Sequence, residues 1–378
     1  MRLRTKILIV LLIPVCVWLI VIQFHTYSYP NTEEIDKRLN YLERVINEPL
    51  HPDRQIMQLK KESYEFMLFT YAYSTYAATN LAVKDSTYKQ RIIPLIRESI
   101  IKTLDNKINH YYSIPKDLTQ LDSIPDCSVL YLGHLNLMLG CYRLISSDTT
   151  FNELNDKISA SLYSRYKGAK IMNLESYTQA IWIPDNTVAL ASLYIHSNNT
   201  GSHYDSLCRE WIAYAKKHLL EKETNVLYST INPATGKTEE EPRGSMLGWS
   251  IMFIYQFDSD FAIQLYQNYK KHFSQEFLVF RLFKERAGSF ETSLGDIDSG
   301  PIFLGYSIPA NEFALGASIL AGDHKTARKL ERLISFGTKK IEKNDEIRYK
   351  VRFVDMNISP MAEALVLNSL TITKWVNE

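Results

Sequence analysis

The sequence of 378 residues is poor in glycine and cysteine and has almost no net charge. It contains only 14 glycines beside 24 tyrosines. So little glycine favours long helices over a turn-rich β fold. The formal net charge is +1, which gives no basis for a nucleic-acid-binding surface. Apolar residues make up 46% of the chain, enough to bury a sizeable core.

Motifs that identify several common enzyme classes are also absent. The sequence has no GxSxG nucleophile elbow, no P-loop, no HExxH zinc motif and no dinucleotide-binding fingerprint. Its four cysteines show neither CxxC nor Cys/His zinc spacing. In an exported chain, any two of Cys127, Cys141 and Cys208 could form one disulfide. We therefore predict no cofactor, and the pattern offers no metal-ligand set.

An uncharged apolar run occupies residues 7–24. Its length is sufficient to span a bilayer core. Three basic residues precede the run and two glutamates follow it, which places the N-terminus in the cytoplasm and exports the rest. We predict a single-pass membrane anchor over residues 1–24, with the body on the periplasmic side; a cleaved signal peptide is the alternative. Residues 25–32 form a spacer, and residues 33–378 form one domain.

Helical patterns dominate this domain. Residues 129–145 are apolar on nearly every face, as in a buried helix, whereas residues 151–166 are amphipathic. This alternation recurs along the chain, and a polar turn with an N-capping residue separates the two helices of each pair. About six such hairpins predict an all-α fold, an (α/α)6 toroid. The long loops 231–243 and 284–309 would converge at one end of its barrel.

Two titratable residues stand in strongly apolar surroundings. His134 lies within the helix predicted at 129–145, and Asp185 precedes the helix predicted at 187–195. Burial of such groups without a partner costs several kcal/mol, so each either is satisfied in the core or belongs to a site. His134 is either a general acid/base or a core histidine bonded to a backbone carbonyl. Asp185 is either a site carboxylate or an ordinary helix N-cap.

Further polar residues precede other predicted inner helices. Asp296 and Asp298 lie between two glycines in the polar loop 295–301, and they could point to the same side of an extended segment. A calcium site of the EF-hand type does not fit the spacing of this loop. Alternatively, the loop is a simple backbone turn. The predicted substrate-binding residues are Tyr131, Glu175, Tyr177, Trp182, Asn186, Arg243, Asp296 and Asp355.

Two short stretches resemble a known family. Residues 131–144 resemble the Tyr-x-Gly-His-Leu helix of the linalool dehydratase/isomerase-like family, and residues 182–190 its aromatic-x-Pro-Cys-Asn element. The resemblance implies an (α/α)6 barrel with His134 in the position of a catalytic histidine. It also implies a departure, because Asp185 and Ser176 stand where the family has its two cysteines. A carboxylate suits conventional proton transfer better than thiol chemistry.

The leading hypothesis is a membrane-anchored, exported enzyme that resembles linalool dehydratase/isomerase. It would carry out elimination or hydration of a hydroxylated substrate by acid/base chemistry, without a cofactor. Asp185 would be the principal acid or base, with His134 as its partner and Asp298 as a second carboxylate. One alternative is a glycan-active hydrolase or lyase of the α/α-toroid type. Another is a non-catalytic toroid that binds a glycan, a lipid or a partner protein. The oligomeric state is open.

Overall fold

The computed structural model describes Val10, residues 12–15, Val17, residues 30–114, Leu121 and residues 124–238, 240–352, 354 and 356–376. The apolar run predicted to be a membrane anchor, residues 7–24, lies mostly outside this set. The predicted site residue Asp355 lies outside it as well. Among the described residues, no helix combines the length and the apolar character that crossing a bilayer requires.

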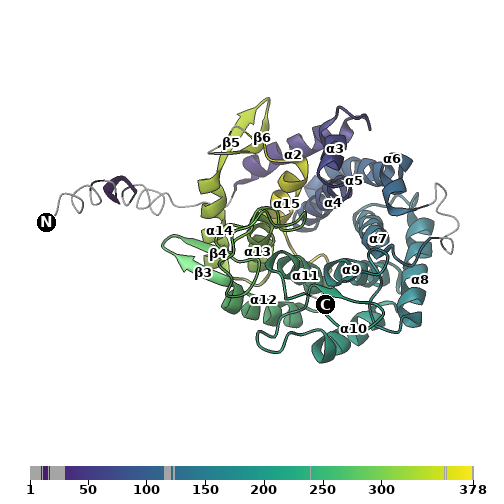
Figure 1. Cartoon of the computed structure of the whole chain (residues 1–378). Helices are drawn as coiled ribbons and strands as arrows, with labels where there is room; N and C mark the ends of the chain where they lie inside the picture. Colours follow the sequence, from purple (N-terminus) through teal and green to yellow (C-terminus); the bar gives the residue numbers. More distant parts are fainter. Residues whose placement is uncertain are drawn as a thin grey trace.

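Within the described chain, six helices form an inner ring (Figure 1). Each packs against the next in chain order, and the last packs against the first, which closes the ring. These helices are apolar on nearly every face because each is covered by neighbours on both sides and by an outer layer behind. They are α4 (Glu65–Lys84), α7 (Val129–Ile145), α9 (Ile183–Thr200), α11 (Gly244–Phe257), α13 (Ile308–Leu320) and α15 (Pro360–Thr371).

An outer layer of helices surrounds this ring (Figure 1). Several of its helices start at a capping residue: the side chain of Asp258 accepts a hydrogen bond from the backbone of Phe261, and that of Asp323 from the backbone of Thr326. The predicted toroid of helical hairpins is therefore confirmed. The outer helices are α2 (Thr32–Asn47), α5 (Lys89–Leu104), α8 (Asn152–Gly168), α10 (Asp205–His218), α12 (Ser259–Phe273) and α14 (His324–Gly337). Short helical segments connect outer with inner helices in the first part of the ring: α3 (Gln55–Gln58), η1 (Leu59–Lys61), η2 (Ser86–Tyr88), α6 (Asn106–Asn109) and η3 (His110–Tyr112).

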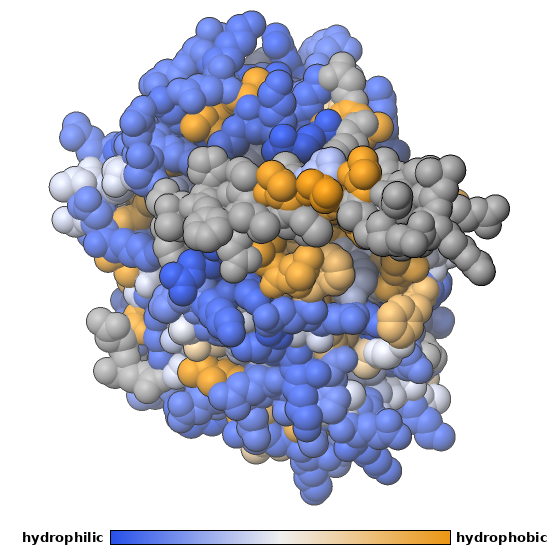
Figure 2. All heavy atoms as spheres, turned by 90° about the vertical axis from the view of Figure 1, so that its left-hand side faces the viewer, coloured by the Kyte–Doolittle hydropathy of each residue, from blue (hydrophilic) through white to orange (hydrophobic). Residues whose placement is uncertain are grey.

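Three small antiparallel sheets, which the all-α prediction did not include, decorate the toroid. Strand β1 (Ile181–Trp182) pairs with β2 (Thr230–Ile231), β3 (Ser274–Phe277) with β4 (Phe280–Phe283), and β5 (Thr338–Lys343) with β6 (Glu346–Val351). The β3–β4 hairpin projects from the left edge of the ring in Figure 1. Figure 2 shows that side, where hydrophilic residues predominate and hydrophobic atoms gather across the middle.

Aromatic side chains fill the middle of the inner ring. The rings of Phe69, Tyr73 and Tyr76 on α4 meet those of Trp249 and Phe253 on α11, with centroids 5.0–6.4 Å apart. Beyond them, the indole N–H of Trp375 donates to Asn80 Oδ1 at 2.6 Å. The interior is therefore packed rather than open. The cysteines Cys127, Cys141 and Cys208 are all free.

Candidate active site

A cavity of about 310 Å³ lies at the end of the ring where the inner helices begin. Four inner helices contribute residues from their first two turns, and two loops complete the wall. The helices provide Glu65 and Phe69 (α4), Leu130 (α7), Pro184 and Asp185 (α9), and Met246 and Trp249 (α11); the loops provide Tyr177, Trp182, Ile297 and Asp298. The site therefore combines three carboxylates with a mainly aromatic and aliphatic wall.

Asp185 lies in the first turn of α9 and is only 5% exposed. The positive end of a helix favours an ionised carboxylate, and so does the hydroxyl of Ser176. Burial outweighs both effects, and the negative charges of Glu65 and Asp298 add to it, so the pKa of Asp185 rises to about 8. At neutral pH this carboxyl group is mostly protonated and can donate a proton.

Glu65 is the first residue of α4 and is paired with a tyrosine. The hydroxyl of Tyr177 donates a hydrogen bond to Glu65 Oε1. Burial raises the pKa of Glu65, and this hydrogen bond opposes the shift. The pair connects the segment before β1 with the inner ring and places a hydrogen-bonded carboxyl group in the cavity wall.

Asp298 comes from the loop between β4 and α13 and faces the cavity beside a buried arginine. Arg243 Nη1 lies 3.7 Å from Asp298 Oδ2. Burial nevertheless raises the pKa of Asp298 to about 7, and the charges of Asp296, Glu65 and Glu285 contribute to the rise. Asp298 is therefore poised between its two protonation states near neutral pH.

Arg243, which the sequence predicts as a substrate-binding residue, is not among the residues that line the cavity. Its Nε lies 2.8 Å from Glu285 Oε1, and its Nη2 lies 2.7 Å from Asp296 Oδ1. Glu285 also accepts hydrogen bonds from the hydroxyls of Ser245 and Ser307 at 2.7 and 2.8 Å. With its guanidinium engaged by these carboxylates, Arg243 holds the loop that carries Asp298 against α11.

The predicted catalytic partner His134 lies outside the cavity wall. Its imidazole is fully buried, and its ring centroid is 5.3 Å from that of Phe69 and 5.7 Å from that of Trp249. Both of these aromatic residues do line the cavity. His134 Nδ1 forms a 2.8 Å hydrogen bond with the hydroxyl of Tyr76, and burial lowers the His134 pKa to about 3. The structure thus unites Asp185 and Asp298 in one cavity but places His134 in the aromatic packing behind it.

Three other predicted substrate-binding residues lie elsewhere in the structure. Tyr131 is buried and donates to the carbonyl of Thr103 at 2.9 Å. Asn186 is fully buried, where its amide bonds the backbone of residues 174 and 182. Glu175 lines a separate groove of about 540 Å³ and accepts a hydrogen bond from the backbone of Gln179. Of the predicted substrate-binding residues that the structure describes, only Tyr177 and Trp182 line the cavity.

Sequence reasoning missed several residues of the wall. Glu65, Phe69 and Trp249 lie in helices that the apolar pattern predicted, but the pattern does not show which turn of a buried helix faces an opening. Pro184 and Ile297 are direct neighbours of Asp185 and Asp298, so adjacency was the available signal for them. Nothing in the sequence marked Glu285 as the buried partner of an arginine.

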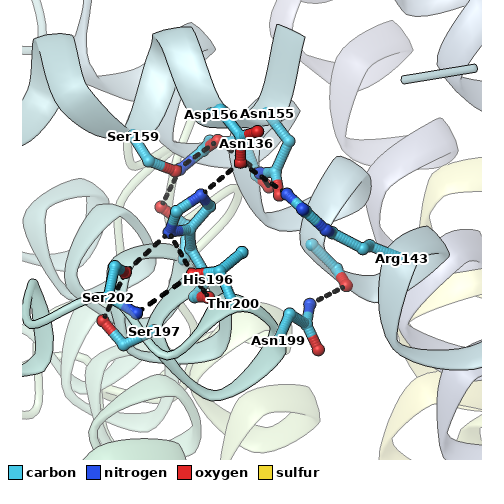
Figure 3. Close-up of polar contacts among 12 residues, drawn as sticks. Asn136, Arg143, Asn155, Asp156, Ser159, His196, Ser197, Asn199, Thr200 and Ser202 are labelled. Carbon is cyan, nitrogen blue, oxygen red and sulfur yellow. Dashed lines mark hydrogen bonds and ion pairs between the residues drawn. The ribbon is translucent and has the colours of Figure 1, made fainter. Parts of the chain in front are cut away.

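A second polar cluster lies among α7, α8 and α9 (Figure 3). His196 Nε2 is 2.8 Å from Asp156 Oδ1, and His196 Nδ1 is 3.1 Å from Ser202 Oγ. This order resembles a hydrolase triad, but Asp156 is also paired with Arg143 at 2.5 Å. None of these residues lines the cavity of Asp185. They join the last turns of α7 and α9 to α8, so the cluster is explained by the packing of helix ends.

Comparison with known proteins supports the architecture and leaves the family open. No family model matches the chain. An unsaturated glucuronyl hydrolase specific for heparin is similar, with a TM-score of 0.54 and 13% identity over 89% of this chain and 95% of that one. The α-1,6-mannanase from Salegentibacter sp. has a TM-score of 0.53 and 10% identity, over 90% of this chain and 98% of that one. The family 105 glycoside hydrolase from C. acetobutylicum has a TM-score of 0.50 and 14% identity, over 80% and 92%.

At such low identities these similarities show the fold alone. The chain adopts the (α/α)6 toroid-like fold of these glycoside hydrolases. An inactive variant of the Salegentibacter mannanase, with a TM-score of 0.52 and 10% identity, has been solved in complex with α-1,6-mannotriose. The resemblance to linalool dehydratase/isomerase receives no support from these comparisons.

Proposed function

We propose that this protein is a glycan-active hydrolase of the α/α-toroid type that acts on a sugar residue bound in the cavity. One observation carries the proposal: Glu65, Asp185 and Asp298 line the same aromatic-walled cavity. The similarity of the fold to glucuronyl hydrolases and α-mannanases supports a glycan as the ligand class. These neighbours act on sugars of different charge, so the fold does not select between them.

The shape and lining of the cavity support a small saccharide ligand. A volume of about 310 Å³ is at the lower end of the range for ligand pockets, and it suits a single sugar residue. Tyr177, Trp182 and Trp249 present apolar ring surfaces, against which the C–H faces of a sugar can pack. The three carboxyl groups can bond its hydroxyls.

The protonation states of the three carboxyl groups support different roles for them in glycoside hydrolysis. Such hydrolysis uses one carboxylic acid to protonate the leaving oxygen and a second carboxylate to activate water or attack the sugar. Asp185 suits the acid, because its pKa of about 8 keeps it protonated at neutral pH. Asp298, beside Arg243, suits the base. Glu65, held by Tyr177, suits binding of a sugar hydroxyl.

The elimination or hydration chemistry predicted from sequence is a second proposal. The protonated state of Asp185 favours it to the same degree, because an acid is also needed to protonate a leaving hydroxyl group. Export and membrane anchoring through residues 7–24 likewise remain proposals that rest on the sequence pattern.

The test is hydrolysis of a panel of α- and β-linked oligosaccharides by the full-length chain, with product analysis by chromatography. We expect turnover of at least one saccharide, and we expect Asp185→Asn to lower kcat by about 10²–10⁴-fold, the usual contribution of general acid catalysis. Asp260→Asn, at an exposed position in the first turn of α12, is the matched control and should retain full activity.

The outcomes separate the alternatives. Unchanged turnover in Asp185→Asn contradicts the assigned acid. An unsaturated product formed without water uptake supports elimination instead. Binding of saccharides without turnover of any of them indicates a non-catalytic toroid.

A further inference from the structure

The charges around the cavity are one-sided. Its described lining contains three carboxyl groups, those of Glu65, Asp185 and Asp298, and no lysine, arginine or histidine. The guanidinium of Arg243 approaches Asp298, but it is already shared among Glu285, Asp296 and Asp298. A carboxylate on a ligand would therefore meet only acidic groups in the described lining, and it would disfavour their ionisation further.

The remaining wall suits a positive charge. Four aromatic side chains line the cavity: Phe69, Tyr177, Trp182 and Trp249. Aromatic faces attract ammonium groups, and the attraction is stronger where water is excluded. Trp249 is 7% exposed, and its indole N–H has no hydrogen-bond partner within the described residues. A buried donor without a partner is costly, so this group points to an acceptor supplied by a ligand, such as a sugar hydroxyl.

Burial is the largest cause of the raised pKa of Asp185 and of Asp298, and mutual repulsion of the carboxyl groups adds to it. The charges of Glu65 and Asp298 help to raise the pKa of Asp185, and the charge of Glu65 helps to raise that of Asp298. A bound ammonium group would relieve this repulsion, whereas a bound carboxylate would add to it.

We propose that the cavity selects a sugar residue that carries a protonated amine and discriminates against a uronic acid residue. This inference rests on the proposed action of the same cavity on glycans and specifies the substrate class. An uncharged sugar should bind with intermediate affinity, because it gains the aromatic contacts without the electrostatic attraction.

The test is calorimetric titration of the full-length chain at pH 7 and low ionic strength with three matched ligands. These are the methyl glycosides of glucosamine, glucose and glucuronic acid, each as both anomers. We expect the glucosaminide to bind at least about tenfold more tightly than the glucoside, and the glucuronide at least about tenfold more weakly. Equal affinities, or a glucuronide that binds as well as the glucoside with uptake of a proton, overturn the proposal.

Variants locate the origin of the selectivity. Glu65→Gln and Asp298→Asn each remove an ionisable carboxyl group with little change of shape, so each should reduce the preference for the glucosaminide at least threefold. Asp260→Asn should leave it unchanged, and thermal unfolding confirms that each variant is folded. An unchanged preference in both cavity variants contradicts the proposal.

The proposed function and this inference can fail separately. Hydrolysis that depends on Asp185, together with no order of affinity by charge, contradicts the inference alone. Absence of binding by all three sugars contradicts the inference, and if no saccharide of the panel is hydrolysed either, the proposed function is contradicted as well.

Discussion

At the scale of single residues, Asp185 shows how burial gives a common carboxyl group an uncommon protonation state. An aspartate in an unfolded chain has a pKa of about 3.9. In the folded chain the pKa of Asp185 is about 8, because the side chain is 5% exposed and faces other carboxyl groups. The folded state therefore binds the additional proton between these two values, and stability decreases as the pH rises through that interval.

Asp185→Asn tests this effect on stability. The amide keeps the shape and cannot ionise, so we expect the free energy of unfolding to increase by a few kcal/mol at about pH 8, since one pKa unit corresponds to about 1.4 kcal/mol. The gain should fall to about 1 kcal/mol at about pH 4.5, because wild-type Asp185 holds its proton in the folded state there and the pH is only about half a unit above the pKa of the unfolded chain. Urea unfolding at the two pH values measures it, with Asp260→Asn as the control. A gain that does not depend on pH contradicts the assigned shift.

The sequence predicted which kinds of residue form the site better than it predicted which individual residues line the cavity. Asp185, Asp298, Tyr177 and Trp182 were selected from sequence and line the cavity. Tyr131 and Asn186 were predicted as site residues for the same reasons of polarity and position. Each instead forms hydrogen bonds with the protein backbone in the interior. Glu65 was not predicted as a site residue, because a glutamate at the start of a helix is common. Only its position beside Asp185 and Tyr177 in the folded chain marks it as part of the site.

At the scale of elements, the loop between β4 and α13 depends on Arg243. This arginine is 2% exposed and contacts Glu285, which is equally buried, and the loop residues Asp296 and Asp298. We expect Arg243→Gln to reduce the free energy of unfolding by about 3–5 kcal/mol, because Glu285 would be left as an unpaired buried charge. Limited proteolysis should also cleave the loop more rapidly.

Arg209→Gln is the control for this prediction. Arg209 pairs with Asp205 on α10 but is 73% exposed, so its removal should cost less than about 1 kcal/mol. A similar small loss for Arg243→Gln in urea unfolding would show that the buried network does not anchor the loop.

The contact between α11 and α13 depends on a glycine. A Cβ added at Gly248 would lie 2.6 Å from Phe313 Cβ and 2.9 Å from its backbone carbon, so the two helices would have to separate. We expect Gly248→Ala to destabilise the chain by about 1–3 kcal/mol, as overpacking does. Gly168→Ala is the control, because a Cβ there meets nothing within 4 Å. The midpoint of thermal unfolding should be lower for Gly248→Ala than for Gly168→Ala. Equal midpoints would contradict the close approach of α11 and α13.

At the scale of the whole molecule, the toroid depends on the contact between its last and first inner helices. α15 packs on α4, and Trp375, which follows α15, packs against Tyr76 and bonds Asn80 on the same helix. We expect Trp375→Ala to reduce the free energy of unfolding by about 3–5 kcal/mol, because a large buried ring and a hydrogen bond are lost together. Trp375→Phe should lose much less. Denaturant unfolding measures both, and equal losses would show that ring volume is unimportant at this closure.

The succession of buried and amphipathic helices, and with it the toroid, can be predicted from the amino-acid sequence. Apolar periodicity and capping residues such as Asp258 and Asp323 act within a few residues of the chain. A short stretch of sequence is therefore sufficient to predict their effect. Which polar groups come into contact depends instead on how the helices pack in three dimensions. Glu65 and Asp185 are distant in the sequence and become neighbours because α4 and α9 begin at the same end of a closed ring. The pKa values of both groups are raised because they are buried together. A local sequence pattern contains no information about this burial.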